Sequence, residues 1–491
     1  MNNNESQHYD VLIVGAGISG IGSAVHLKKQ CPDKNFCVLE GMESYGGTWL
    51  IHNYPGVRSD SDLFTFGYRF KPWKGKPIAS GQEILNYMGE VIDENKLNSH
   101  IQYNHQIDSA SWSNDTQLWT LTVKDKTNNT DLIFTTNFLW MNQGYYKHAK
   151  GYTPNWPGMD QFKGPIIHPQ TWPEDLDYKN KKVIIIGSGA TTATVAPAIA
   201  AACEHVTVLQ RSPTYFVPRP NNIEITTQLR DLGVDEEIVH DITRRQVLKE
   251  QQEVVNLSRQ YPDEVKKSLI DGVKQCLPEG YDVDTHFTPS YRPWRQRIAV
   301  VPNGDLFKGI SAGKAEMVTD EIERFTEKGL LLKSGKKLEA DIILTATGFN
   351  LSVLGGIKFF VDEKEIDFSE SVTYRGMMFT GLPNMAWVMG YFRASWTLRV
   401  DLIGDFICRL LKNMDNKGAK QISLTIPEED KNMELLPWGD TEEFNPSYLM
   451  RSMHLLPKRG NTSNWQHTQD YWEERELLPK VDLNEKIFVY S

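Results

Sequence analysis

The chain has 491 residues, of which 40% are apolar and 24% charged, and its formal net charge is -10. This length exceeds the size at which a single hydrophobic core keeps growing, so we expect two or three domains. The acidic balance argues against a nucleic acid or an anionic membrane as the main partner. Any cationic site must therefore be local.

The N-terminus and the cysteines indicate the compartment. The first ten residues, MNNNESQHYD, are polar and lack the basic start and apolar core of a signal peptide. No apolar run of about 18 residues, the length needed to cross a membrane, follows. The five cysteines have no metal-ligand spacing, and their odd number would leave one unpaired in an oxidising compartment. We expect a soluble cytoplasmic protein without a metal site or an integral membrane span.

A glycine-rich motif follows the apolar run of residues 11–14 and precedes a helical pattern. Glycines at this spacing allow a tight turn and a close backbone approach to a pyrophosphate, and the helix N-terminus offers free N–H groups to the anion. The next strand-like run ends at Glu40, about 20 residues after the last glycine, where a carboxylate typically binds an adenosine ribose. The pattern predicts a dinucleotide-binding unit, whose glycine turn and helix N-terminus we call the first cradle. Its motif residues are Gly15, Gly17, Ser19 and Gly20.

A second cradle begins after the apolar run of residues 183–186 and again leads into a helical pattern. Its third position departs from glycine, because Thr192 holds the strict spacing and Ala193 lies one residue later. The strand that follows closes with Arg211 and Ser212, which suit a 2′-phosphate that a carboxylate would repel. The second nucleotide is therefore predicted to be NADP rather than NAD, although a lone arginine there would ordinarily be a solvated strand-end charge. The motif residues are Gly187, Ser188, Gly189, Ala190 and Thr191.

Two cradles in one chain imply two dinucleotides whose redox rings meet, and we assign FAD to the first and NADPH to the second. Strand-like runs end at Gly144 and again at Gly348, which suggests that the first sheet resumes after an insertion. The predicted fold is α/β, with two Rossmann-like dinucleotide-binding domains and the NADP domain nested in the FAD domain. A helical excursion is predicted over residues 222–284, with solvated charges. The predicted divisions are an FAD-binding domain over 1–150 and 336–491, a linker over 151–180, and an NADP-binding domain over 181–335.

The linker contains the stretch FKGPIIHPQTWP. Phe162, Gly164, His168, Trp172 and Pro173 match the F-x-G-x-x-x-H-x-x-x-W-P fingerprint of type I Baeyer–Villiger monooxygenases, which are class B flavoproteins. Further segments, among them GGTW, YPGVRSDSD, LQRSPTY, PWRQR and VPNGDLF, resemble the bacterial ethionamide-activating subgroup of that family over nearly the whole chain.

The resemblance implies a single-component enzyme that uses tightly bound FAD, NADPH and O2. Such enzymes insert one oxygen atom beside a ketone carbonyl and give an ester or lactone through a peroxide at the flavin C4a carbon. Many also oxygenate thioethers or thioamides. The implied partners are therefore O2 and a small-molecule ketone or thioether. The aromatic segment GYFRASW, residues 390–396, could line the substrate pocket.

The resemblance also implies a catalytic arginine. It falls within HFTPSYRPWRQRIAVVPNGD, which offers Arg292, Arg295 and Arg297, and the alignment selects Arg297. Such a cation would stabilise an anionic oxygen nucleophile in a water-poor site. Gln296 stands where many relatives have a lysine that also helps to hold the 2′-phosphate. The expected preference for NADPH therefore depends on Arg211 and Ser212.

Asp60, in YPGVRSD, corresponds to the family's carboxylate that pairs with this arginine. Asp62 would share its face in an extended segment, so only the motif match selects Asp60, which would otherwise be interpreted as a turn cap. We expect a structural or hinge role for His168, because a proline follows it and no partner for a general base is visible. For Gly47, spacing alone fits a plain glycine turn equally well. The other cofactor-binding residues that the resemblance implies are Gly47, Thr48, Trp49, Arg58, Ser59, Asp60 and Ile107.

Three other classes share part of the pattern. A pyridine-nucleotide disulfide reductase needs a C-x-x-x-x-C pair near the flavin, whereas Cys31 and Cys37 are spaced differently and precede Glu40. A flavin monooxygenase that oxygenates mainly sulfur or nitrogen shares both cradles and needs no catalytic arginine. A flavoprotein sensor that only binds its cofactors is disfavoured by the second cradle and by Arg297.

Overall fold

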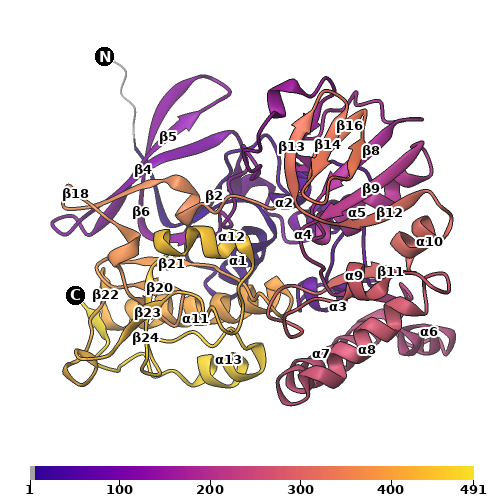
Figure 1. Cartoon of the computed structure of the whole chain (residues 1–491). Coiled ribbons are helices and arrows are strands. Elements are labelled where there is room, and N and C mark those ends of the chain that lie inside the picture. The colour runs from indigo at the N-terminus through magenta and orange to yellow at the C-terminus, as the bar shows by residue number, and fades with distance from the viewer. Residues whose placement is uncertain (1–5) are drawn as a thin grey trace.

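A computed structural model of the chain describes residues 6–491. The expectation that a signal peptide is missing falls partly on residues 1–5, which lie outside this range. Two sheets dominate the fold, one at the left and centre of Figure 1 and the other at its upper right. Each combines parallel strands with covering helices, so the predicted α/β fold with two Rossmann-like domains is confirmed.

The first sheet has nine strands within the described residues and is built around β1 (Gln7–Val14). β1 pairs in parallel with β2 (Phe36–Leu39) on one side and β6 (Thr130–Met141) on the other. The second half of β1 is a run of buried apolar side chains, as expected of a parallel strand covered on both faces. The other strands are β3 (Ile101–Gln102), β4 (His105–Ser113), β5 (Leu118–Asp125), β17 (Lys358–Val361), β18 (Lys364–Glu365) and β21 (Met385–Trp387).

Helices from both ends of the chain cover this sheet. α1 (Ile18–Gln30) follows β1 and packs against α11 (Trp396–Lys417) and α4 (Gly81–Glu94). Two short helices, α2 (Thr48–Ile51) and α3 (Leu63–Phe66), lie in the connection between β2 and α4. The C-terminal part of the chain thus completes the first domain around the first cradle.

The second sheet has, in the described range, five parallel strands in the order β12-β9-β8-β16-β7. We expected the run that ends at Gly348 to resume the first sheet, but its strand β16 pairs with β8, so the second sheet extends past the predicted boundary at residue 335. An apolar strand followed by glycine looks the same at the carboxyl edge of either sheet, so this local pattern cannot choose between them. The first sheet is resumed by β17 and β21 instead. The bounds are β7 (Ile166–Ile167), β8 (Lys182–Ile186), β9 (His205–Gln210), β12 (Ala315–Thr319) and β16 (Ile342–Thr345).

The chain passes between the two sheets twice, first from β6 to β7 and later from β16 to β17. The two crossings are bonded to each other. Lys147 N donates a hydrogen bond to Asn350 O at 2.8 Å. The fingerprint braces the first crossing, because Gln170 Nε2 donates to the carbonyl oxygens of Lys147 and His148 at 2.7 and 2.6 Å. Since β7 is an edge strand of the second sheet, the fingerprint is part of that sheet's domain rather than a free loop.

The predicted helical excursion lies at the lower right of Figure 1, between β10 (Phe216–Arg219) and β11 (Ala299–Pro302). Its long helix α7 (Glu236–Gln260) packs against α3 of the first domain. The expectation that its charges are solvated is wrong for Arg244, which is 8% exposed because its guanidinium binds backbone carbonyls around α3. The neighbouring helices are α5 (Ala190–Ala200), α6 (Glu224–Asp231), α8 (Pro262–Lys274), α9 (Val283–Phe287) and α10 (Asp305–Ser311).

Smaller elements complete both domains. A three-stranded antiparallel sheet extends the second domain, and three strand pairs and two short helices pack around the C-terminal part of the first. They are β13 (Ile322–Thr326), β14 (Gly329–Leu332), β15 (Lys337–Glu339), β19 (Thr373–Tyr374), β20 (Met378–Phe379), β22 (Ile422–Leu424), β23 (Leu435–Pro437), β24 (Lys458–Gly460), β25 (Phe488–Tyr490), α12 (Ser447–Ser452) and α13 (Tyr471–Leu477).

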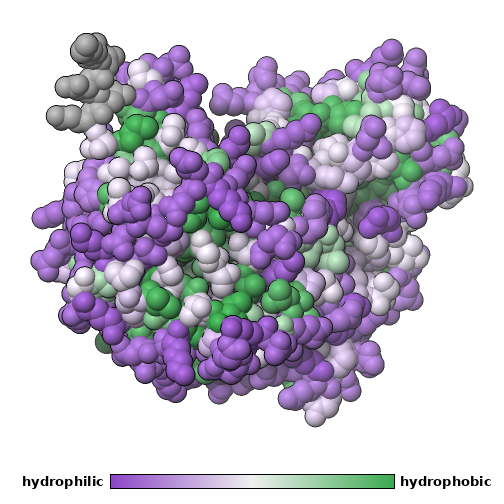
Figure 2. Space-filling model, turned by 90° about the vertical axis from the view of Figure 1, so that its left-hand side faces the viewer, coloured by the Kyte–Doolittle hydropathy of each residue, from purple (hydrophilic) through white to green (hydrophobic). Residues whose placement is uncertain are grey.

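The surface matches the composition of a chain with many charged residues. Figure 2 shows one face on which hydrophilic side chains predominate and hydrophobic patches lie between them. Among residues 6–491, no helix combines the length and the apolar character that crossing a membrane requires.

Candidate active site

The first cradle lies at the carboxyl end of β1. Gly15 has a φ of 97°, which favours glycine, and a Cβ there would lie 2.9 Å from the Asn142 carbonyl oxygen. At Gly20 a Cβ would lie 1.7 Å from the Gly15 carbonyl oxygen. Gly17 is the N-cap of α1, where no side chain caps the helix and the first turn holds no acidic residue. The N–H groups at this helix end therefore remain available to an anion.

Glu40 follows β2 directly and is 7% exposed. Its Oε2 accepts a hydrogen bond from Ala16 N at 2.6 Å, and its Oε1 accepts one from Met42 N at 2.8 Å. Burial raises the pKa of Glu40, although these backbone hydrogen bonds oppose the rise. The predicted ribose acceptor thus lies beside the glycine turn and also orders its backbone.

The GGTW segment lies against the same cradle. A Cβ at Gly17 would lie 3.7 Å from the Cα of Gly47. Thr48 is exposed and Trp49 half-buried at the start of α2. The Trp49 ring meets that of Phe66 edge-on, with ring centres 5.8 Å apart, which connects this segment to α3.

Ile107 lies in β4, near the predicted ribose acceptor. His105 N donates to Glu40 O at 2.8 Å, so β4 begins beside Glu40. Ile107 is buried two residues further on, where the pairing of β4 with β5 is irregular. The structure therefore brings Ile107 to the neighbourhood of the first cradle.

The second cradle lies at the carboxyl end of β8. Gly187 has a φ of 123°, and a Cβ there would lie 2.3 Å from the Ala346 carbonyl oxygen. Gly189 is the N-cap of α5, again without a side-chain cap, and a Cβ there would meet nothing within 4 Å. Thr192, at the position that departs from glycine, is buried and donates from Oγ1 to Gly187 O at 2.9 Å. Ala190 and Thr191 lie in the first turn of α5, where the N–H groups have no partners within the helix and no side chain caps them.

The end of β9 presents the predicted 2′-phosphate site. Arg211 and Ser212 are exposed, and no ion pair of Arg211 is found within residues 6–491. Gln210, in contrast, is buried and donates from Nε2 to His286 O at 2.7 Å. Ser188 Oγ lies 3.3 Å from the Ser212 carbonyl oxygen, which ties the glycine turn to this strand end. The guanidinium of Arg211 is therefore free to meet an anion.

Arg297 and Asp60 form a two-pronged ion pair. Arg297 Nε donates to Asp60 Oδ2, and its Nη2 donates to Oδ1 at 2.8 Å. Burial disfavours the charge on Arg297, but Asp60 outweighs this effect and raises the pKa of the guanidinium above its usual value. Arg292 and Arg295 face other partners, Glu443 and Glu442, each at 2.9 Å. Of the three candidate arginines, only Arg297 meets the predicted carboxylate.

The structure separates the roles of Asp60 and Asp62. Asp62 is the N-cap of α3, and its Oδ1 accepts a hydrogen bond from Thr65 N at 2.9 Å. The turn-cap role considered for Asp60 thus belongs to Asp62, which leaves Asp60 free to hold Arg297. Two residues earlier than Asp60, Arg58 points toward the second domain and binds Asp305 at 2.5 Å and the carbonyl oxygen of Ala193 in α5 at 3.0 Å.

Ser59, another predicted cofactor-binding residue, is 4% exposed. Its Oγ donates to Ser61 O at 2.5 Å and accepts from Ser61 N at 3.0 Å. These bonds shape the turn between Arg58 and Asp60. The side chains of Arg58 and Ser59 are therefore engaged with protein groups, and they fix the segment that carries Asp60.

Sequence reasoning missed a group of tyrosines around Arg297. The hydroxyls of Tyr145 and Tyr146 lie 2.6 Å apart, and the ring of Tyr448 packs against both. Burial raises the pKa of each of the three tyrosines, and the Arg297 charge opposes this rise. Tyr145 also stacks on Trp396 with ring centres 5.1 Å apart. The aromatic segment 390–396 signalled Trp396, but the tyrosines belong to no motif that was singled out.

Trp396 connects this group to the first cradle, because its Nε1 donates to Ser19 Oγ at 2.7 Å. Two buried polar atoms nearby have no partner within residues 6–491: Oε1 of Gln143, which lies beside Gly15, and Nε1 of Trp294, three residues before Arg297. Uncapped helix ends, a cradle open at Gly189 and unpaired buried polar atoms all suit dinucleotides. The residues present therefore fit FAD and NADP.

His168 has the structural role expected of it. Its Nδ1 accepts a hydrogen bond from Gln170 N at 3.1 Å, so the ring proton is on Nε2, which donates to Gly348 O at 3.0 Å. Burial lowers the pKa of His168, which favours this neutral form. A Cβ at Gly151 would lie 2.0 Å from the His168 Cε1, so a glycine is needed there. The imidazole joins the linker to the second crossing.

Comparisons with known proteins bear on this site. A family model described as flavin-binding monooxygenase-like matches residues 78–382. The chain is 43% identical over 483 residues to the FAD-containing monooxygenase EthA of Mycobacterium tuberculosis, which covers 98% of this chain and 97% of the relative. It is 43% identical over 484 residues to the probable FAD-binding monooxygenase AlmA of an Acinetobacter species, covering 98% of this chain and 96% of the relative.

Among solved structures, an oxidised steroid monooxygenase bound to NADP has a TM-score of 0.76 with this chain, at 22% identity over 99% of both chains. That likeness establishes the fold, and the relatives that align end to end confirm the resemblance proposed from the motifs. The family model and the full-length identity together show that this chain is an enzyme of the flavin-binding monooxygenase-like family.

Proposed function

We propose that this protein uses FAD, NADPH and O2 to insert one oxygen atom beside a ketone carbonyl, giving an ester or a lactone. The observation that carries this proposal is the Arg297–Asp60 ion pair, which contacts connect to both cradles. Toward the second cradle, the segment of Asp60 is bound to α5 through Arg58. Toward the first, Tyr145 beside Arg297 stacks on Trp396, whose Nε1 donates a hydrogen bond to Ser19 Oγ. A fixed cation connected to both dinucleotide sites is suited to stabilise the negative charge that develops on oxygen during its transfer to a carbonyl.

We assign FAD to the first cradle and NADPH to the second. The glycine turns and uncapped helix ends would bind the pyrophosphates, Glu40 the adenosine ribose of FAD, and Arg211 with Ser212 the 2′-phosphate of NADPH. In this assignment residues 1–150 and 336–491, apart from β16, form the FAD domain, and residues 181–335 with β16 form the NADP domain. The bound cofactors supply hydride transfer and the activation of O2.

Arg297 would stabilise negative charge that develops on oxygen during attack on the carbonyl. Asp60 holds the guanidinium through two hydrogen bonds, which fixes its orientation and keeps it charged. The pairing does not bury the cation fully, because 40% of the Arg297 side chain remains accessible. That surface is available to a substrate.

The aromatic group beside Arg297 would shape the substrate site. Tyr145 and Trp396 stack, and the hydroxyls of Tyr145 and Tyr146 share a hydrogen bond. Rings in this arrangement exclude water and accept an apolar ketone, while a hydroxyl can donate to the carbonyl oxygen. Thioethers and thioamides fit the same lining, and soft sulfur needs no cation for its oxygenation.

Substitution of Arg297 by Ala tests the proposal. We expect ester formation from a panel of linear and cyclic ketones to fall by at least about 100-fold, because the fixed cation is lost, while NADPH still reduces the flavin at a similar rate. Arg295→Ala is the matched control, since it removes a nearby guanidinium paired with the exposed Glu442. Oxygenation of thioanisole should decline less than that of ketones in the Arg297 variant.

Undiminished ester formation by the Arg297 variant would refute the assigned role. If wild-type protein oxygenates thioanisole and amines but no ketone of the panel, the function is that of an S- or N-oxygenating flavin monooxygenase.

We also infer a reducing compartment, the cytoplasm, because all five cysteines are free thiols.

A further inference from the structure

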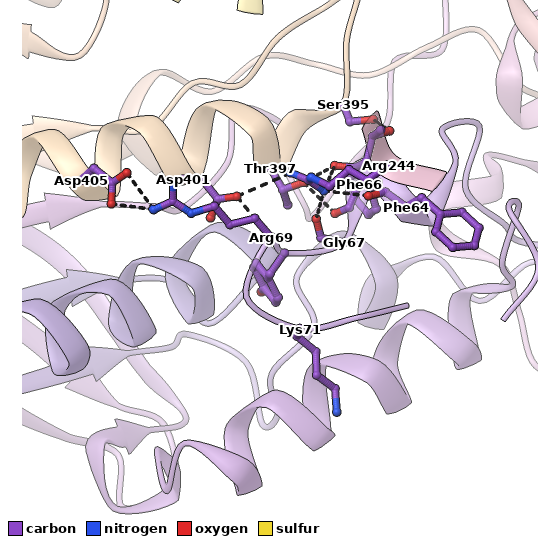
Figure 3. A network of polar contacts seen from close by, with 12 residues as sticks. Phe64, Phe66, Gly67, Arg69, Lys71, Arg244, Ser395, Thr397, Asp401 and Asp405 are labelled. Carbon is purple, nitrogen blue, oxygen red and sulfur yellow. Dashed lines mark hydrogen bonds and ion pairs between the residues drawn. The ribbon is translucent and has the colours of Figure 1, made fainter. Parts of the chain in front are cut away.

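Arg244 in the helical excursion binds the first domain rather than solvent. Its Nη1 lies 2.7 Å from the carbonyl oxygen of Phe64, 3.3 Å from that of Thr65 and 3.1 Å from that of Gly67. These are carbonyls of the last turn and the C-cap of α3, which a helix this short leaves without partners of its own. Figure 3 shows the guanidinium pointing from α7 into this end of α3. One cation therefore binds three carbonyls at the C-terminal end of α3.

The same face of α7 also reaches the other end of α3. Gln251 lies two helical turns after Arg244, and its Nε2 donates to Oδ2 of the N-cap residue Asp62 at 2.9 Å. Asp62 is 2% exposed, so water cannot solvate its carboxylate, and Gln251 supplies a hydrogen bond instead. α7 therefore holds α3 at both ends.

Helix α11 and its N-cap residue Ser395 also bind α3. Thr397 Oγ1 donates to Phe66 O at 2.7 Å, and Ser395 Oγ lies 2.7 Å from Thr65 Oγ1. Asp401, which is 3% exposed, lies 3.8 Å from Arg244 Nη2 and offsets its charge. Figure 3 shows these groups together, with the charge network continuing to Arg69 and Asp405. The position of α3 is thus set by polar contacts from two helices far apart in the sequence.

The residue that α3 controls is Asp60. It lies two residues before the Asp62 cap, with only Ser61 between them, and it holds Arg297. A shift of α3 would therefore move the Asp60 carboxylate relative to the guanidinium. Misplacement of a catalytic group by about 1 Å can lower a rate by two orders of magnitude.

We propose that Arg244 is a positioning residue, which acts through α3 on Asp60 and hence on Arg297. This gives the helical excursion a function: it is the support on which the ion pair is oriented. The inference rests on the proposed function for the identity of the reaction, but the mechanical link from Arg244 to Asp60 stands on contacts alone.

The test uses FAD-loaded protein and three variants: Arg244→Met, Asp60→Ala and the double variant. Methionine keeps apolar volume while removing the donors. We expect Arg244→Met to form at least about tenfold less product per NADPH oxidised, with flavin reduction by NADPH within about twofold of wild type. Arg245→Met is the matched control, because the neighbouring Arg245 side chain is 78% exposed and we expect no change.

The double variant separates positioning from general support of the fold. If Arg244 acts through Asp60, Asp60→Ala removes what Arg244 positions, and adding Arg244→Met causes little further loss of product. Amide hydrogen exchange should also accelerate in residues 57–67 of Arg244→Met while the strands of the first sheet keep their protection. Additive losses in the double variant, or unchanged exchange over residues 57–67 in a folded variant, would overturn the proposal.

Two further arms keep the outcome decisive. Should Arg244→Met fail to fold, Gln251→Leu removes the hydrogen bond at the other end of α3, and the same cycle with Asp60→Ala applies. Product is measured with a linear ketone, a cyclic ketone and thioanisole. If wild-type protein oxygenates only thioanisole, the proposed ketone function fails, while the exchange measurement still decides whether Arg244 holds the Asp60 segment.

Discussion

The two cradles share the order of strand, glycine turn and helix, yet they differ in what surrounds the turn. At the first, a Cβ on Gly17 would lie in van der Waals contact with the GGTW segment, 3.7 Å from the Cα of Gly47, and Glu40 is buried. At the second, a Cβ on Gly189 would meet nothing within 4 Å, and Arg211 is exposed.

The difference indicates how each cofactor is used. An enclosed cradle with a buried carboxylate suits a cofactor that remains bound through many turnovers. An open cradle with an exposed guanidinium suits one that enters and leaves in each turnover, guided by charge. The surroundings of each turn therefore correspond to tightly bound FAD and exchangeable NADPH in the proposed assignment.

The largest expected effect comes from filling the open cradle. Gly189→Val adds a side chain where the pyrophosphate of NADPH would lie, so we expect flavin reduction by NADPH to fall by about 100-fold, with FAD content and melting temperature unchanged. Stopped-flow absorbance of the flavin measures this. Gly187→Val is the contrast, because a Cβ there would lie 2.3 Å from Ala346 O and should destabilise the fold itself. Equal behaviour of the two variants would break the comparison.

A smaller effect is expected at the end of β9. Arg211→Ala removes an exposed guanidinium that would bind the 2′-phosphate, so the KM for NADPH should rise about tenfold or more while the KM for NADH changes little. Steady-state kinetics with both nucleotides checks this. A similar rise for NADH would remove the argument for NADP, and it would direct attention to Gln296.

The smallest effect concerns the enclosed cradle. Glu40→Gln keeps an acceptor for the Ala16 N–H but loses the charge, so we expect FAD to dissociate about three- to tenfold more readily. Burial raises the pKa of Glu40. In the proposed assignment the ionised form would accept the hydrogen bonds of the ribose. Retention of FAD by wild type should therefore weaken as the pH falls through this raised pKa, whereas the variant should lack that step. FAD fluorescence after gel filtration at several pH values measures both.

Much of the fold follows from local chemistry. The strand, glycine turn and helix of each cradle are contiguous in the chain, and their positive φ values and short backbone contacts leave few alternatives at Gly15 and Gly187. The assignment of Arg297 to Asp60 required a family pattern, because periodicity could not separate Asp60 from Asp62. The structure separates them through a cap at α3 that one residue can provide and the other cannot.

What could not be predicted depends on contacts between distant parts of the chain. The strand β16 has the same local pattern in either sheet, and only its pairing with β8 decides between them. Arg244 lies in a helix with many solvated charges, and its burial results from docking on α3. The bond from Trp396 to Ser19 joins distant parts of the sequence. Such contacts have no local signature.

The paired crossings between the two sheets have a mechanical consequence. A single crossing would allow rotation in several directions, but here Lys147 is hydrogen-bonded to Asn350. In addition, His168 binds Gly348 of the second crossing, and Gln170 binds Lys147 of the first. Two connections bonded side by side favour rotation about the line that runs along them over other relative motions of the domains. Such a rotation would have to open the contacts that Arg58 and Arg244 make between the domains. We therefore expect the fingerprint to act as a hinge that sets the direction in which the second domain would rotate relative to the first.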